Sequence, residues 1–216
     1  ITDDLYVLSV GIDARNYDRK IKLNCCIDSN ILQSKSLSVK EVIESTLEAG
    51  ENNENYDYMI AVKNYCERAK EYLNGDTVKE SKFVDYEKYL NAAKQEISSS
   101  LDCIALDSFS IVLRSKVSMR IYFFLNSVAD KISVKIDGNL VEFQSTGNEN
   151  EFYVEIGESK FSEFGEIHSL VFETEGNKVQ TVKINILAYL KDAITKQGGE
   201  IKNLALAAIG VYAASM

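Results

Sequence analysis

Only a few residues of this chain combine the types and spacing that catalysis would need. His168 is the one histidine among 216 residues, so no second imidazole is present to complete a zinc site. Its neighbours predict a strand, where an isolated histidine is most often hydrogen bonded or at the surface. A Ser/His/Asp arrangement stays open, although the chain has no GxSxG nucleophile elbow. A thiol dyad with Cys66 is disfavoured, because Cys66 lies on the apolar stripe of a predicted helix.

The four cysteines show neither CxxC spacing nor a Cys/His ligand pattern. Cys25 and Cys26 are adjacent, so in a strand their side chains point to opposite faces and do not pair with each other. We interpret all four as small buried apolar residues: Cys25, Cys26, Cys66 and Cys103. The cysteines therefore leave both their redox state and the redox compartment undetermined.

Carboxylates are plentiful in the second half of the chain. They include Asp137, Glu142, Glu149, Glu151, Glu155, Glu158, Glu163 and Glu166. A pair at a suitable separation would hydrolyse glycosides, but we favour a solvated acidic sheet face. The turn 137–139 and the loop 148–151 offer oxygen ligands for calcium without the spacing of an EF-hand, so we interpret both as turns. The two glycines at 198–199 lack the lysine of a phosphate-binding loop. The sequence predicts no catalytic residue, metal ligand or cofactor.

Tyrosine, with 12 residues, is the residue type best suited to binding. Exposed stacking platforms for a sugar or a protein partner are to be sought among Tyr6, Tyr56, Tyr58, Tyr86, Tyr89 and Tyr153. Other tyrosines lie on apolar helical stripes and are expected in the core: Tyr65, Tyr72 and Tyr212. The ligand-binding residues remain unknown at this level.

Composition and charge exclude some classes of partner and bear on the fold. The net charge of −9 argues against a general grip on nucleic acid or on anionic membranes, since both need clustered Lys and Arg. The chain has no run of about 18 apolar residues, so we expect no membrane insertion. With 45% apolar residues it can bury a core, and with no proline its turns must use Gly, Asn and Asp.

Two pairs of segments resemble each other. Residues 7–23 and 152–168 each show an alternating strand, a glycine, a polar loop with an aromatic residue and a second strand. Residues 60–69 and 204–213 match as core-facing helices. The shift is 146 residues for the first pair (156 − 10) and 144 for the second (204 − 60). We therefore predict a unit of about 145 residues, whose first copy lacks a counterpart of residues 102–150 and continues upstream of Ile1.

The first hundred residues predict a small sheet and helices. Alternating apolar residues indicate strands at 5–10, 21–25 and 32–37. Ser38 and Glu41 form a capping box that begins a helix over 39–48. A longer helix over 56–73 ends at Gly75. The charged segment 76–100 is mostly helical in pattern, with one stripe formed by Tyr86, Leu90, Ala93 and Ile97.

From residue 102 the chain is rich in short strands. Apolar alternation predicts them at 109–113, 117–125, 132–136, 140–143, 152–156, 167–173 and 179–184. Turn signals such as Asp137-Gly138 separate them. Seven short strands within about 85 residues are typical of a β-sandwich of immunoglobulin-like size. Helices over 185–196 and 200–215, separated by two glycines, predict a helical hairpin after it.

These elements predict an α+β fold in three parts. Residues 1–75 form a partial repeat unit with a short sheet and a helical hairpin, and residues 76–101 form a helical connector. Residues 102–216 form a full unit, an immunoglobulin-like antiparallel β-sandwich followed by an α-helical hairpin.

Five stretches carry a resemblance to a known kind of module: LSVKEVIESTL (37–47), AVKNYCERAKEYLNG (61–75), FSIVLRSKVSMRIYFFL (109–125), NEFYVEIG (150–157) and LALAAIGVYAASM (204–216). The chain resembles uncharacterised repeat modules near the C-termini of large secreted or surface proteins of anaerobic Firmicutes (Clostridia). It departs from them at Cys66, where the first helix usually has Gly, and at Ile209, where the second usually has Tyr. The resemblance implies an extracellular accessory module appended to other domains, and it implies no catalytic residues.

We therefore expect a non-catalytic module, extracellular or at the cell surface, that serves as a structural spacer or in adhesion within a larger protein. Its partners would be a protein or a glycan at the cell surface and further domains of the same parent chain. A carbohydrate-binding module is the alternative, and it requires exposed coplanar aromatic rings on one sheet face. A fragment of a secreted hydrolase is the second alternative, and it requires a cleft with carboxylates, or with His168 against a nucleophile.

Overall fold

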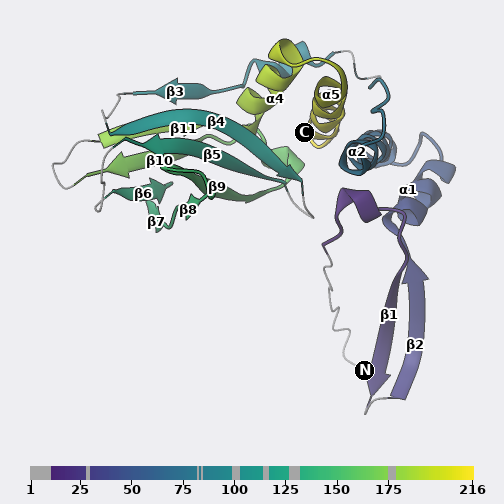
Figure 1. Cartoon of the computed structure of the whole chain (residues 1–216). Coiled ribbons are helices and arrows are strands. Elements are labelled where there is room, and N and C mark those ends of the chain that lie inside the picture. Colours follow the sequence, from purple (N-terminus) through teal and green to yellow (C-terminus); the bar gives the residue numbers. More distant parts are fainter. Residues whose placement is uncertain are drawn as a thin grey trace.

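The computed structural model of the chain describes residues 11–27, 30–81, 83, 85–98, 103–113, 117–126, 132–174 and 179–216. It is a mixed α+β structure whose sheets are antiparallel. The two larger sheets lie together at one end, the helices pack beside them, and a two-stranded arm projects from the other end (Figure 1). The strand expected at 5–10, together with Tyr6, lies outside the described residues.

Two sheets face each other in the β-rich part. The first contains, in spatial order, β3 (Gln95–Ile97), β11 (Val179–Ile184), β10 (His168–Glu173), β6 (Ser133–Ile136) and β7 (Asn139–Val141). The second contains β4 (Ile104–Leu113), β5 (Val117–Leu125), β9 (Glu151–Ser159) and β8 (Gln144–Ser145). Phe123 of β5 meets Phe172 of β10 edge to face, with ring centroids 5.1 Å apart, so the inner faces share one apolar layer.

The expected tight turn joins β6 to β7. Asp137 and Gly138 both have positive φ, at 50° and 83°, as the central residues of a type I′ hairpin turn must. Asp137 thus has a left-handed backbone conformation, which Asp tolerates better than most residues other than glycine. The hairpin predicted from this dipeptide is confirmed.

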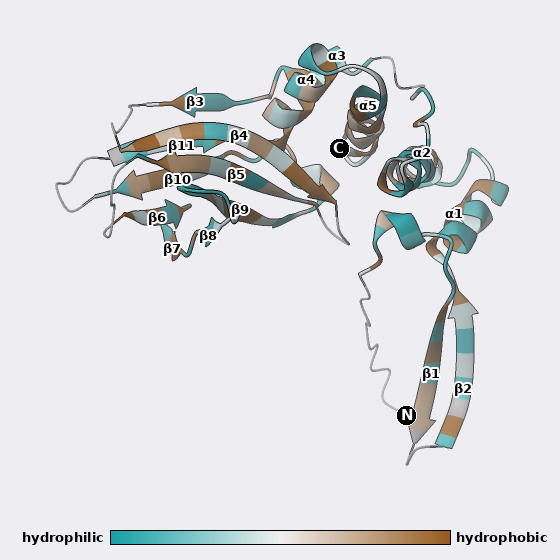
Figure 2. Cartoon of the chain, viewed as in Figure 1, coloured by the Kyte–Doolittle hydropathy of each residue, from teal (hydrophilic) through white to brown (hydrophobic). Residues whose placement is uncertain are grey.

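Four helices lie close to their expected bounds. They are α1 (Val39–Glu48), α2 (Tyr56–Asn74), α4 (Ile186–Lys196) and α5 (Gly199–Ala214). The predicted capping box at the start of α1 is present, because Ser38 accepts from the amide of Glu41 and Glu41 accepts from the amide of Ser38. Gly75, with φ of 74°, ends α2. In α5, every residue from Leu204 to Tyr212 is buried, and the helix contacts α2, α4 and η2 (Phe161–Glu163). Figure 2 shows α5 between α4 and α2.

The helical pattern expected over 76–100 is wrong. Among the described residues of this stretch, 76–81, 83 and 85–98, the structure holds one four-residue helix, α3 (Glu87–Leu90), and then the strand β3. The backbone of β3 pairs with β11, with Ile97 opposite Val182, and it takes the edge of the five-stranded sheet. Ile97 stays 50% exposed, so the expected apolar stripe is not buried as one. Sheet pairing has outweighed the local helical preference.

Two stretches of the structure repeat one element order. The first runs η1 (Ala14–Asn16), β1 (Ile21–Ile27), β2 (Asn30–Leu37), α1 and α2, and the second runs η2 (Phe161–Glu163), β10, β11, α4 and α5. The turn bonds repeat as well: the amide of Lys40 donates to the carbonyl of Tyr17 (2.9 Å), and that of Leu187 donates to the carbonyl of Phe164 (3.3 Å). Both partners shift by 147 residues (187 − 40 and 164 − 17).

The strand register follows the same shift. Leu23 lies opposite Lys35 in the first copy, and Leu170 lies opposite Val182 in the second (170 − 23 and 182 − 35, each 147). The second helices shift less, from Tyr56 to Gly199 (199 − 56 = 143), because the loop between α4 and α5 is the shorter one. The two stretches therefore share backbone geometry as well as element order.

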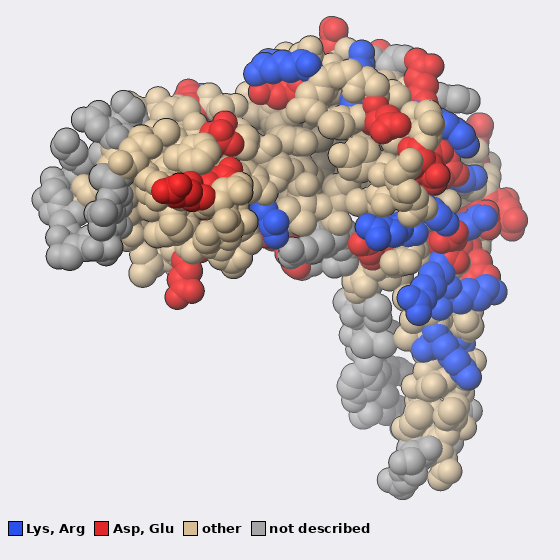
Figure 3. All heavy atoms as spheres, viewed as in Figure 1, with Lys and Arg blue, Asp and Glu red and all other residues tan. Residues whose placement is uncertain are grey.

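The surroundings of the two strand pairs differ. β10 and β11 lie in the five-stranded sheet, whereas β1 and β2 form a sheet of their own that projects as an arm (Figure 1). Leu170 is fully buried, but its counterpart Leu23 is only partly buried. On the face seen in Figure 3, Lys and Arg side chains gather over the arm and its base, where Lys20 pairs with Glu41 (2.7 Å). The arm is therefore a largely solvated part of the fold, although it carries apolar side chains such as Ile31, which is 57% exposed.

Asn185, the residue before α4, is fully buried and joins three segments. Its Oδ1 accepts hydrogen bonds from the amides of Ala188 (3.1 Å) and Lys94 (2.9 Å). Its Nδ2 donates to the carbonyls of Ala92 (2.7 Å) and Gly165 (3.1 Å). The side chain thus ties the connector, the loop before β10 and the start of α4 to one point.

We predict that Asn185→Ala lowers the free energy of unfolding by about 3 kcal/mol, because it leaves several buried amides and carbonyls without partners. Ser38, the corresponding cap of α1, caps one amide, so Ser38→Ala should cost about 1 kcal/mol. Urea unfolding followed by circular dichroism measures both. If Asn185→Ala and Ser38→Ala lowered the free energy of unfolding by the same amount, the role assigned to Asn185 would be contradicted.

Candidate functional site

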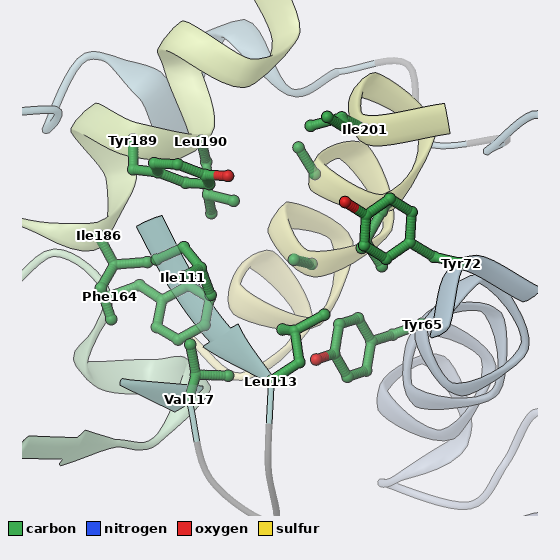
Figure 4. Close-up of a pocket in the computed structure, with 13 residues that line it drawn as sticks. Tyr65, Tyr72, Ile111, Leu113, Val117, Phe164, Ile186, Tyr189, Leu190 and Ile201 are labelled. Carbon is green, nitrogen blue, oxygen red and sulfur yellow. The ribbon is translucent and has the colours of Figure 1, made fainter. Parts of the chain in front are cut away.

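A cavity lies where α2, α4 and α5 meet the ends of β4 and β5 (Figure 4). Its volume is about 80 Å³. The described residues that line it are apolar except for three tyrosine hydroxyls: Tyr65, Tyr72, Ile111, Leu113, Val117, Phe164, Ile186, Tyr189, Leu190, Ile201, Leu204, Ala205 and Ala208. The cavity exists because small residues of α5 face large residues of α2 and α4 across it.

Three hydroxyls point into this cavity from two helices, those of Tyr65 and Tyr72 on α2 and that of Tyr189 on α4 (Figure 4). Tyr65 is 6% exposed, and Tyr72 is 37% exposed. None of the three makes a hydrogen bond to another residue in the described part of the chain. They are unpartnered donors in an apolar wall.

Burial keeps the hydroxyls of Tyr65 and Tyr189 protonated. It raises the pKa of Tyr65 far above the ordinary value, with a smaller contribution from the Cys66 thiol. It also raises the pKa of Tyr189, and the neighbouring Tyr72 adds to the effect. The described lining carries no carboxylate, amine or imidazole, so the cavity offers hydrogen-bond donors and apolar contact but no group for acid–base chemistry near neutral pH.

His168 lies at the start of β10, away from this cavity. Its Nδ1 is 2.8 Å from Oδ2 of Asp137, and the other oxygen of Asp137 accepts from the amide of Ser169 (2.8 Å). Burial alone would raise the pKa of Asp137, but the hydrogen bonds from His168 and Ser169 outweigh it and lower that pKa. Among the described residues no hydroxyl or thiol bonds to the other ring nitrogen, so this pair fastens the β6–β7 turn to β10.

The four cysteines differ from one another. Cys66 is buried, as expected, and Cys103 is only partly buried. Cys25 and Cys26 are exposed, so our interpretation of these two as buried is wrong. The reason is that no second sheet lies over β1 and β2 among the residues that the structure describes. Burial, and to a lesser extent Glu67, raises the pKa of Cys66 to about 12, which keeps the thiol protonated.

Several of the carboxylates named above interact with nearby side chains. Glu155 pairs with Arg120 (2.9 Å) and accepts from the hydroxyl of Ser118 (2.5 Å). Glu151 accepts from Thr146 and Asn148 (2.6 Å each), which lowers its pKa and closes the loop 146–151. Within the described ranges no group of three or more His, Cys, Asp or Glu side chains is placed to hold a metal ion.

The tyrosines suggested as stacking platforms are all partly buried where the structure describes them: Tyr56, Tyr58, Tyr86, Tyr89 and Tyr153. Tyr72, expected in the core, is the more exposed residue. One pair lies on the outer face of the four-stranded sheet, where Tyr122 is opposite Tyr153, with ring centroids 5.7 Å apart and planes tilted by 41°. The guanidinium of Arg120 lies 4.6 Å from the Tyr153 ring.

Our sequence reasoning did not single out Tyr122 or Tyr189. The alternation of β5 carried a signal for Tyr122, because the apolar residues buried on this strand are odd-numbered from Val117 to Leu125, and Tyr122 must therefore face outward. Tyr189 had no such signal, since its role depends on α2, a helix more than one hundred residues earlier in the chain.

We predict that alkylation of the native protein at pH 8 distinguishes the thiols. Cys25 and Cys26 should react at least about 100-fold faster than Cys66, because Cys66 is buried and protonated. Iodoacetamide labelling followed by peptide mass spectrometry measures the rates, and labelling in urea shows that all four thiols are reactive once unfolded. A rate for Cys66 equal to that of Cys25 would contradict the packing of α2.

Comparison of the chain with protein-family models, with curated proteins and with solved structures finds no match. No helix in the described part of the chain is both long and apolar enough to span a bilayer. The geometry of the fold and its surfaces is therefore the basis for a functional proposal.

Proposed function

We propose that the chain is a non-catalytic extracellular module that holds parts of a larger surface protein at a fixed spacing. It would consist of one full unit, an immunoglobulin-like sandwich followed by a helical hairpin, and the latter part of a preceding unit. The repeated element order and the shared shift of 147 residues support this division. The partners we propose are a protein or glycan at the cell surface and further domains of the same chain.

The packing of α2 against the second copy carries this proposal. The ring of Tyr65, on α2, lies edge to face on Phe161 of η2, with centroids 4.9 Å apart. Phe161 in turn lies 5.0 Å from Phe164, whose ring stacks on Tyr212 of α5 at 6.3 Å. A chain of aromatic contacts therefore runs from the first helical pair into the second.

The connector strengthens the same junction. Asn64 on α2 donates from its side chain to the hydroxyl of Ser81 (3.1 Å), and Asn203 on α5 donates to the carbonyl of Val78 (3.4 Å). Val78 and Ser81 are both buried. The segment between the copies is thus bound to a helix of each, which favours a fixed spacing over two beads on a flexible linker.

We predict a narrow distance distribution between nitroxide labels placed at Glu54→Cys and Glu149→Cys, two exposed positions in the first and second copies. Electron–electron double resonance measures it, in a background with Cys25→Ser and Cys26→Ser. Phe161→Ala should broaden the distribution, because it removes the ring that joins α2 to η2.

Leu140→Ala is the matched control, since Leu140 is 71% exposed and lies far from the junction along the chain. A broad distribution in the parent protein would overturn the role as a spacer. An unchanged width in Phe161→Ala would show that other contacts fix the spacing.

Carbohydrate binding is the second candidate function, and the outer face of the four-stranded sheet favours it. Tyr122 and Tyr153 share this face with Arg120 and Glu155, so rings and hydrogen-bonding groups stand side by side. The tilt of 41° makes the rings a twisted platform, not the coplanar one that the sequence alternative required. Such a platform fits the faces of successive sugar rings along one twisted chain.

A glycan array followed by calorimetry with the best glycan tests this candidate. Tyr153→Ala should weaken binding at least about fivefold, through the loss of one stacking surface. Tyr56→Ala, a partly buried tyrosine on α2, should leave the affinity unchanged. No signal on the array would remove carbohydrate binding and leave the spacer proposal untouched.

A further inference from the structure

We propose that the cavity between α2, α4 and α5 binds a small neutral molecule of about three or four carbon atoms with one oxygen acceptor. The volume of about 80 Å³ exceeds what a single water molecule needs. It is smaller than the roughly 150 Å³ cavity in which benzene binds. By the same ratio of ligand to cavity, a body of about three or four carbon atoms fits here, whereas benzene or an alicyclic ring of similar volume does not.

The hydroxyl of Tyr65 supplies the polar contact. Its side chain is more than nine-tenths buried, and the hydroxyl points into the cavity without a hydrogen-bond partner in the described part of the chain (Figure 4). This donor faces the cavity with no partner from the protein, so an acceptor oxygen placed there makes a hydrogen bond in an apolar setting where few water molecules compete for it. The remaining wall, formed by residues such as Leu113, Val117 and Ala208, matches an apolar body.

The ligand should be neutral. No lining residue in the described ranges carries a charge that would pair with an ionised group, and a lone charge in such a wall is strongly unfavourable. Tyr72 and Tyr189 place two further hydroxyls at the cavity. Tyr72 is 37% exposed, so this side offers access from solvent without unfolding of α5.

Two ligands of matched shape test the proposal, acetone and isobutene. We expect acetone to produce saturable shifts of the amide and methyl resonances around the cavity in heteronuclear NMR titrations of the full chain. Tyr65→Phe keeps the ring and removes the hydroxyl, so it should weaken acetone binding at least fivefold and leave isobutene binding unchanged.

Ala208→Met fills the cavity and should abolish the shifts with both ligands, provided that its circular dichroism matches that of the parent protein. If this variant does not fold, the comparison between Tyr65→Phe and the parent protein decides alone. The proposal is overturned if neither ligand gives saturable shifts, if only water occupies the cavity, or if Tyr65→Phe weakens both ligands equally.

Discussion

The fold depends on one buried amide side chain. Asn185 has no contact with solvent, so each of its polar atoms must find a partner inside the protein, and four backbone groups supply them. Those groups come from the connector, from the loop after η2 and from α4. One side chain therefore fixes where the helical pair begins relative to the five-stranded sheet, and the cavity and the aromatic contacts at the junction follow from that placement.

The first copy shows what the same backbone does with fewer constraints. Ser38 holds the position of Asn185, but its side chain caps a single amide, and the strands before it form an arm with no sheet packed over it. Cys25 and Lys35 stand where the second copy has the buried residues Phe172 and Val182. Polar and small side chains in the first copy suit the solvated surface on which they lie.

Local signals in the sequence were enough to predict α1, α2, α4 and α5 and the β6–β7 turn, because residues such as Ser38, Gly75 and Asp137-Gly138 act within a few residues. The strand β3 was not predictable in this way, since its partner strand lies more than eighty residues later. The similarity of the two stretches was visible in the sequence, with shifts of 146 and 144 residues. The shift of 147 residues became visible only from the turn hydrogen bonds and the strand register, which the sequence does not show. The cavity was hidden as well, since its three hydroxyls come from two copies.

The central position of α5 has a consequence for how the protein is made. This helix has buried residues on all sides from Leu204 to Tyr212, and it contacts α2, α4 and η2. During synthesis the two larger sheets and α2 leave the ribosome before α5 does. The apolar side chains that α5 covers in the folded protein therefore stay exposed until it emerges. The nascent chain would therefore expose the most apolar surface to chaperones just before α5 emerges. Tertiary packing of both copies would then be completed together, once α5 is available.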